Sequence, residues 1–224
     1  MFLIITACTA KKDDSIPIIS KTKIVEPSYY LDRRNLISEL CKIRDRIFQD
    51  PQAQVGTKIT TAFDLYVRAG KAYKKLWENN YKRLKSQLFS SQDIEWFFLS
   101  GGYGIIHALE EAKRYQATFN RNISYQKGIP YTANLWRKIL PLICESIIKK
   151  FNPEWIYVFG SRDYTVFIKQ TDFWRQMNNV KIIESTGSAG PSWLSPILNE
   201  LVNSILDKNL RTFNQKYKLF VKQP

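Results

Sequence analysis

Short apolar runs alternate with amphipathic segments along this chain. The apolar runs span residues 2–6, 94–99, 155–159 and 181–184, and each one ends in a small, polar turn. Runs of this length between turn signals predict strands, and burial on both faces is typical of strands in a parallel sheet. We therefore expect four strands, with burial on both faces for the first, over residues 2–6.

Between these runs, apolar side chains recur at the spacing of one helix face. Four helices are predicted, marked by Leu36, Leu40, Ile43 and Ile47; by Leu65, Ala69, Tyr73 and Leu76; by Leu135, Ile139 and Ile143; and by Leu194, Ile197, Leu201 and Ile205. We expect Asp32 to cap the first helix and Pro141 to kink the third. Alternating strands and helices predict an α/β fold. We expect one compact domain over residues 1–224, with a central mixed, largely parallel sheet flanked by helices.

The opening stretch MFLIITACTAKK has two interpretations. Residues 5–8 resemble the small-residue box before a lipid-modified cysteine, whereas residues 2–6 also suit a buried strand that leads into a basic loop. A secretory leader needs a charged start and roughly 7 to 15 apolar residues, but no Lys or Arg precedes Cys8 and only residues 2–5 are large and apolar. We favour the strand and expect a cytoplasmic protein. No apolar run approaches the roughly 20 residues of a membrane helix.

The charge balance points to a polyanionic partner. Lys and Arg number 34 against 20 Asp and Glu, which gives a formal net charge of +14. Residues 69–87 interleave Lys and Arg with Tyr73, Trp77 and Tyr81, a pattern that suits nucleic acid, although for any single residue a solvated helix face with core aromatics is the stronger interpretation. For the whole chain, we expect nucleic acid as the partner, ahead of an anionic membrane surface.

Cysteine and histidine usage gives no metal signature. Cys8, Cys41 and Cys144 are widely spread, and the single histidine, His107, completes no zinc spacing. P-loop, GxSxG and GxGxxG motifs are also missing from the sequence. We expect reduced thiols and no cofactor.

The segments after the four predicted strands are the candidate binding loops. They read TACTAKK, SGGYG, GSRDY and STGSAGPS. In open α/β sheets, ligands bind outside the carboxyl ends of the strands, so the four loops would gather at one pocket. Glycines allow close backbone approach there, and free N–H groups can hold an anion.

Residues 99–119, LSGGYGIIHALEEAKRYQATF, resemble the hallmark segment of the YaaA family of peroxide-stress proteins. The matching positions are Leu99, Ser100, Gly101, Tyr103, Gly104, Leu109 and Tyr115. Glu110 falls where the family has Asp, while Ala108 and Arg114 replace its prolines. LIITACTAKK, FDLYVRAGKAYKKL, ANLWRKI and VFGSRDY resemble further family segments in the same order.

This resemblance implies one compact α/β domain, distantly similar to uracil-DNA glycosylases, with a basic cleft that binds DNA. Some members of the wider group look like anti-phage glycosylases that remove bulky modified bases. Two functions therefore stay open. The first is excision of a modified base from phage DNA, and the second is non-enzymatic DNA binding in a stress response, as YaaA itself is described.

Base excision needs a flipped nucleotide, a carboxylate beside the developing positive charge on the sugar, and a donor for the leaving base. Glu110 and Asp163 are the candidate carboxylates, although Glu110 also suits the first turn of a helix. We expect His107 to be exposed or to contact phosphate. The candidate nucleic-acid-binding residues are Thr9, Lys11, Lys12, Ser100, Gly101, Gly102, Tyr103, Arg114, Tyr115, Ser161, Arg162 and Ser188. The expected partner is modified or distorted DNA, in an oligomeric state that the sequence leaves open.

Overall fold

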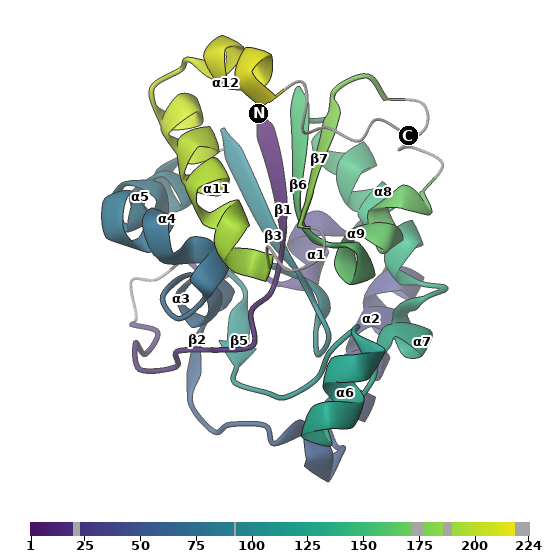
Figure 1. Cartoon of the computed structure of the whole chain (residues 1–224). Helices are drawn as coiled ribbons and strands as arrows, with labels where there is room; N and C mark the ends of the chain where they lie inside the picture. Colours follow the sequence, from purple (N-terminus) through teal and green to yellow (C-terminus); the bar gives the residue numbers. More distant parts are fainter. Residues whose placement is uncertain (20–22, 92, 172–176, 186–189, 218–224) are drawn as a thin grey trace.

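A five-stranded sheet in the order β4-β3-β1-β6-β7 forms the centre of the computed structural model (Figure 1). Strands β1, β3, β6 and β7 run parallel, and β4 pairs antiparallel with β3 at one edge. The strands are β1 (Phe2–Ala7), β3 (Ile94–Ser100), β4 (Gly104–His107), β6 (Trp155–Ser161) and β7 (Val180–Ser185). A separate antiparallel pair joins β2 (Ile59–Thr61) to β5 (Glu111–Lys113).

The predicted strands are confirmed, each extending slightly beyond its apolar run. Strand β1 lies in the middle of the sheet, where Leu3, Ile4 and Ile5 are fully buried. Its pairing partners β3 and β6 lie more than 90 and 150 residues further along the chain, in the registers Phe2 to Ile94 and Phe2 to Trp155. The chain is thus one compact α/β domain with a mixed, mostly parallel sheet.

The structure describes residues 1–19, 23–91, 93–171, 177–185 and 190–217. Its helices are α1 (Pro27–Tyr30), α2 (Arg34–Phe48), α3 (Ala62–Val67), α4 (Lys74–Asn79), α5 (Tyr81–Ser90), α6 (Arg121–Lys127), α7 (Ala133–Trp136), α8 (Leu140–Phe151), α9 (Arg162–Lys169), α11 (Gly190–Leu206) and α12 (Leu210–Lys216). Two short 3₁₀ helices, η1 (Pro51–Ala53) and η2 (Lys71–Tyr73), complete the described helical segments.

Helices cover both faces of the sheet (Figure 1). Helices α11, α12, α4 and α5 lie together on one face, where α11 contacts β6 and β7 and α5 contacts β3. Helices α8 and α9 lie on the opposite face with α1. The apolar side chains of the two layers and of the sheet form one continuous core.

Three expectations about the helices were wrong in detail. The predicted helix over residues 65–76 breaks at Gly70 into α3, η2 and α4, because the chain turns there against Thr9, whose side chain lies 2.3 Å from where a Gly70 Cβ would stand. The predicted third helix, through residues 135–143, divides into α7 and α8 with a turn over residues 137–139, and Pro141 lies in the first turn of α8, where it lacks only a hydrogen bond that the helix does not make. Asp32 lies outside α2 and pairs with Lys150 at 2.8 Å.

Within the described ranges, none of the helices combines the length and the apolar character that crossing a bilayer requires.

Candidate functional site

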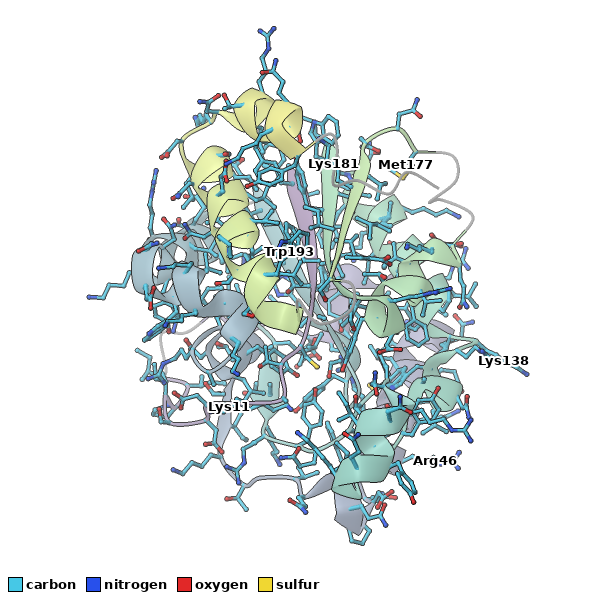
Figure 2. All side chains as sticks on the ribbon, in the orientation of Figure 1. Lys11, Arg46, Lys138, Met177, Lys181 and Trp193 are labelled. Atoms are coloured by element: carbon cyan, nitrogen blue, oxygen red, sulfur yellow. The ribbon has the colours of Figure 1, made fainter. Side chains whose placement is uncertain are left out.

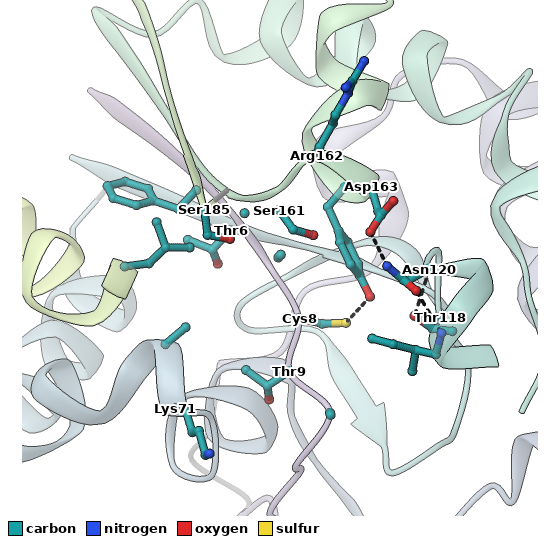
Figure 3. A pocket seen from close by; sticks show the side chains of 18 of the residues that line it. Thr6, Cys8, Thr9, Lys71, Thr118, Asn120, Ser161, Arg162, Asp163 and Ser185 are labelled. Carbon is teal, nitrogen blue, oxygen red and sulfur yellow. Dashed lines mark hydrogen bonds between the residues drawn. The ribbon is translucent and has the colours of Figure 1, made fainter. Parts of the chain in front are cut away.

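A cavity of about 1100 Å³ opens at the carboxyl edge of the parallel strands (Figure 3). The ends of β1, β6 and β7 form its floor, and the first turn of α9 forms one wall. The start of α11, the short helix η2 and the segment over residues 116–129 supply the rest of the lining. Three of the four predicted strand ends therefore do meet at one pocket, as parallel topology requires.

Positive charge dominates the lining. Six cationic residues contribute to it: Lys11, Lys12, Lys71, Lys127, Arg162 and Lys169. Two carboxylates, Asp163 and Glu184, also line the cavity. The Glu184 carboxylate is already neutralised, because it pairs with Lys169 at 2.5 Å and accepts a hydrogen bond from Thr165. The remaining cations give the cavity a net affinity for anions.

Asp163 is the cavity carboxylate without a cationic partner among the described residues. It lies in the first turn of α9, where the helix dipole favours negative charge. The Asn120 amide donates to its Oδ2 at 2.6 Å (Figure 3). This neutral hydrogen bond orients the carboxylate and leaves its charge uncompensated.

A group of buried hydroxyls and one thiol lies beneath the cavity. Cys8 Sγ is 3.8 Å from the Tyr164 hydroxyl and 3.6 Å from the Tyr115 hydroxyl. The Tyr115 hydroxyl also meets Ser100 Oγ at 2.5 Å and the Tyr66 hydroxyl at 3.1 Å. Burial raises the pKa of the Tyr66, Tyr115 and Tyr164 phenols well above the usual value, so all three keep their protons at neutral pH. Of these groups, Cys8 and Tyr164 line the cavity, whereas Tyr66, Tyr115 and Ser100 are fully buried and support them from behind.

Six of the fourteen candidate site residues lie at the cavity. The structure brings together Thr9, Lys11, Lys12, Ser161, Arg162 and Asp163 from two strand ends far apart in sequence. Thr9 shapes the first loop through a hydrogen bond from its hydroxyl to the carbonyl of Lys11, at 2.5 Å. The exposed side chain of Arg162 extends away from Cys8 and Asn120 (Figure 3).

The SGGYG turn is buried, which corrects the expectation that it opens to a ligand. It joins β3 to the antiparallel strand β4, and the hairpin packs against other backbone. A Cβ on Gly101 would lie 2.5 Å from the Ala117 carbonyl oxygen, and one on Gly102 would lie 2.6 Å from the Tyr115 ring. Ser100 and Tyr103 are 0% and 5% exposed, so neither reaches the cavity surface.

Glu110 also lies away from the cavity. Its carboxylate pairs with the buried guanidinium of Arg44 at 2.5 Å and accepts a hydrogen bond from the Tyr30 hydroxyl at 3.0 Å. Burial alone would lower the pKa of Arg44, but the Glu110 carboxylate outweighs it and the pKa is raised. The structure therefore gives Glu110 a charge partner inside the fold.

The remaining candidates are more scattered. His107 is buried, which corrects the expected exposure, and its Nε2 lies 2.7 Å from Glu95. Tyr115 is buried below the cavity wall, and Arg114 is exposed outside the lining. Ser188 lies outside the described residues.

Sequence reasoning missed several lining residues, among them Cys8, Lys71, Asn120, Lys127, Tyr164 and Glu184. Cys8 and Tyr164 stand within the quoted strand-end loops and could have been found there. Asn120 and Lys127 come from a segment that follows β5, and only the tertiary fold carries it to the cavity.

A scan against models of known protein families finds no match to this chain, and a search of curated protein sequences finds none either. The resemblance to the YaaA family therefore rests on the residues quoted above.

Proposed function

We propose that this protein is a DNA glycosylase that excises a modified base in the cytoplasm, with Asp163 as the carboxylate beside the sugar. The observation that carries this proposal is one cavity that combines a cationic lining with a carboxylate that lacks a cationic partner among the described residues.

The size of the cavity supports a flipped nucleotide. At about 1100 Å³, it slightly exceeds the roughly 300–1,000 Å³ that small-molecule sites occupy. A flipped base with its sugar and a bulky substituent fits such a volume, whereas a purely backbone-binding protein needs only a shallow basic groove.

The charged side chains of the cavity suit two different parts of a flipped nucleotide, its phosphates and its sugar. Lys11, Lys71 and Lys127 are exposed cations at its lining and suit the phosphates on either side of a flipped nucleotide. Asp163 suits the sugar, where positive charge develops as the bond to the base breaks. The protonated phenol of Tyr164, next to Asp163 in the chain, is a donor for the leaving base.

The second candidate is DNA binding without catalysis. The exposed cations on α4 and α5, Lys74, Lys75, Lys82 and Arg83, favour it, since they extend the basic surface beyond the cavity even though Glu78 pairs with Lys74 and Lys75 and Asp207 pairs with Arg83. Both candidates require DNA affinity, so only base release separates them.

The test is incubation with phage DNA that carries modified bases, followed by mass spectrometry of the released bases. Asp163→Asn keeps shape and removes charge, so base release should slow by about 10²-fold or more while DNA affinity is retained. Asp45→Asn, an exposed change on α2, is the control and should release base at the parent rate.

Two outcomes would contradict the assignment. If Asp163→Asn excises normally while a folded Glu110→Gln is inactive, the catalytic role belongs to Glu110. If the parent protein binds the modified DNA and releases no base, the non-enzymatic function replaces the glycosylase.

A further inference from the structure

Lys12 differs from the other lysines of the cavity. Lys11, Lys71 and Lys127 are exposed, and Lys169 is paired with Glu184. Lys12 is half-buried, and its Nζ lies over the ring face of Tyr115, 4.2 Å from the ring centroid. Among the described residues, no carboxylate lies within ion-pair distance of this amine. Lys12 is thus a half-buried amine of the cavity, and no carboxylate among the described residues stabilises its charged form.

The platform under Lys12 is rigid. Tyr115 is fully buried, and its hydroxyl is held by Ser100 and Tyr66 at 2.5 and 3.1 Å. Cys8, four residues before Lys12, approaches the same hydroxyl. A lysine side chain laid on a fixed ring loses little further freedom on reaction, which favours a defined position for its amine.

On balance the surroundings favour the neutral amine, although the face of the Tyr115 ring itself attracts the ammonium. Burial lowers the pKa of the Lys12 ammonium from its usual value, and the positive charges of Lys127 and Arg114 act in the same direction, while Cys8 opposes them. Only a neutral amine has the electron pair that a nucleophile needs. Desolvation beside other cations is a known way to produce a reactive lysine.

We propose that Lys12 forms a covalent imine with the sugar of an abasic nucleotide, so that the protein cleaves the strand after it releases the base. This inference rests on the proposed glycosylase function. In the first step, the Lys12 amine adds to the C1′ aldehyde of the ring-opened sugar, a carbon–nitrogen double bond forms, and water leaves. In the second, the C2′ proton passes to water, the electron pair of that C–H bond forms a C2′–C3′ double bond, and the C3′–O bond breaks with its electron pair leaving on the 3′ phosphate. Hydrolysis of the imine then restores the amine.

Asp163 and Lys12 thereby act in sequence on one sugar. Asp163 stabilises the positive charge during loss of the base, and Lys12 reacts with the aldehyde that results. Both side chains line the same cavity, although they come from the ends of different strands, β1 and β6. Lys12 would be a catalytic residue of the second reaction alone.

The experiment uses a synthetic duplex that already contains one abasic site, so it does not depend on recognition of any modified base. The full-length protein is incubated with this duplex and sodium borohydride, which reduces an imine to a stable secondary amine. We expect a covalent protein–DNA adduct, and peptide mass spectrometry should locate it on Lys12. Lys12→Arg keeps the charge and lacks a reactive amine, so the adduct should fall at least tenfold. Lys138→Arg, an exposed change outside the cavity lining, should leave it unchanged (Figure 2).

The result that overturns the proposal is the absence of an adduct with the parent protein, or an adduct that maps to another lysine. Because the mapping is done on the parent, it does not depend on whether Lys12→Arg folds. Base release from modified DNA is measured in parallel. Base release without an adduct overturns the Lys12 inference and leaves the glycosylase in place. An adduct on Lys12 without base release supports imine formation by Lys12 and contradicts the proposal that the protein excises bases.

Discussion

At the scale of single residues, the two candidate carboxylates differ in their interaction partners. Glu110 faces a buried guanidinium, Arg44, whereas Asp163 faces a neutral amide at the edge of a cavity. A carboxylate paired inside the fold contributes to stability, because its removal leaves the partner's charge buried and alone. A carboxylate held by an amide keeps its charge available to a ligand.

Glu110→Gln should therefore destabilise the protein. Loss of the charge that faces Arg44 should lower the free energy of unfolding by about 3 kcal/mol, measured by urea denaturation. Glu111→Gln is the matched control, since this exposed neighbour should change stability by less than about 0.5 kcal/mol. Equal stabilities for the two variants would contradict the structural role of Glu110.

Gly104 provides a second test at this scale. Its φ is +69°, and a Cβ there would lie 2.5 Å from the Trp136 ring, so Gly104→Ala combines backbone strain with a steric clash. We expect a loss of about 3 kcal/mol in urea denaturation. Gly128→Ala separates the two effects, because Gly128 has φ +60° and no atom within 4 Å of the added Cβ. Its loss should be about 1 kcal/mol, and a loss as large as that of Gly104→Ala would rule out the clash.

At the scale of elements, helix α11 connects the cavity to the basic helices. It contacts η2 and α4 on one side and β6 and β7 on the other. Asn80, between α4 and α5, donates from its side-chain amide to Asn199 and Asn203 of α11, both at 2.8 Å. These contacts fix α4 and η2 against the sheet and so position Lys71 at the cavity.

Asn80→Ala should loosen this junction. The change removes both hydrogen bonds, and because Asn199 and Asn203 are half-exposed, water replaces part of the loss. We expect the free energy of unfolding to fall by about 1–2 kcal/mol. Amide hydrogen exchange should rise in α4 and η2 and stay unchanged in β1 and β3; uniform exchange across all four would show that Asn80 does not act on the junction.

At the scale of the whole molecule, the net charge of +14 exceeds what the cavity alone contains. Exposed cations occur over much of the outer surface, including Arg46 on α2 and Lys138 after α7 (Figure 2). Such a surface attracts any polyanion, so specificity must come from the cavity, and general affinity from the surface.

Duplex DNA binding should therefore weaken steeply with salt, with log affinity falling by about 0.9 per neutralised phosphate for each unit of log salt. The double variant Lys71→Gln/Lys127→Gln removes two cavity cations and should reduce this slope by about 1.8. Lys138→Gln, outside the lining, is the control. Its DNA binding is titrated at the same salt concentrations, which measures how much the loss of a surface charge elsewhere changes the slope. An unchanged slope in the double variant would show that DNA does not enter at the cavity.

The sequence determined the local parts of this protein. Apolar runs located β1, β3, β6 and β7, because helices cover the interior strands on both faces and even the edge strand β7 buries Ile182 and Ile183. The expected parallel direction of those strands, with a polar turn after each, also indicated the edge of the sheet where Thr9, Lys11, Lys12, Ser161 and Asp163 meet. These inferences need only neighbouring residues and one topological rule.

Tertiary structure decided which side chains became partners. The SGGYG motif has the composition of an open anion-binding loop, yet a hairpin buries it, and nothing local reports that Arg44 lies beside Glu110. Asn120 and Lys127 reach the cavity because long-range packing brings their segment there. Burial and charge pairing depend on residues far apart in the chain. Only the folded molecule therefore shows that Asp163 and Glu110 differ in their charge partners, and that Lys12 differs from the other cavity lysines in its burial.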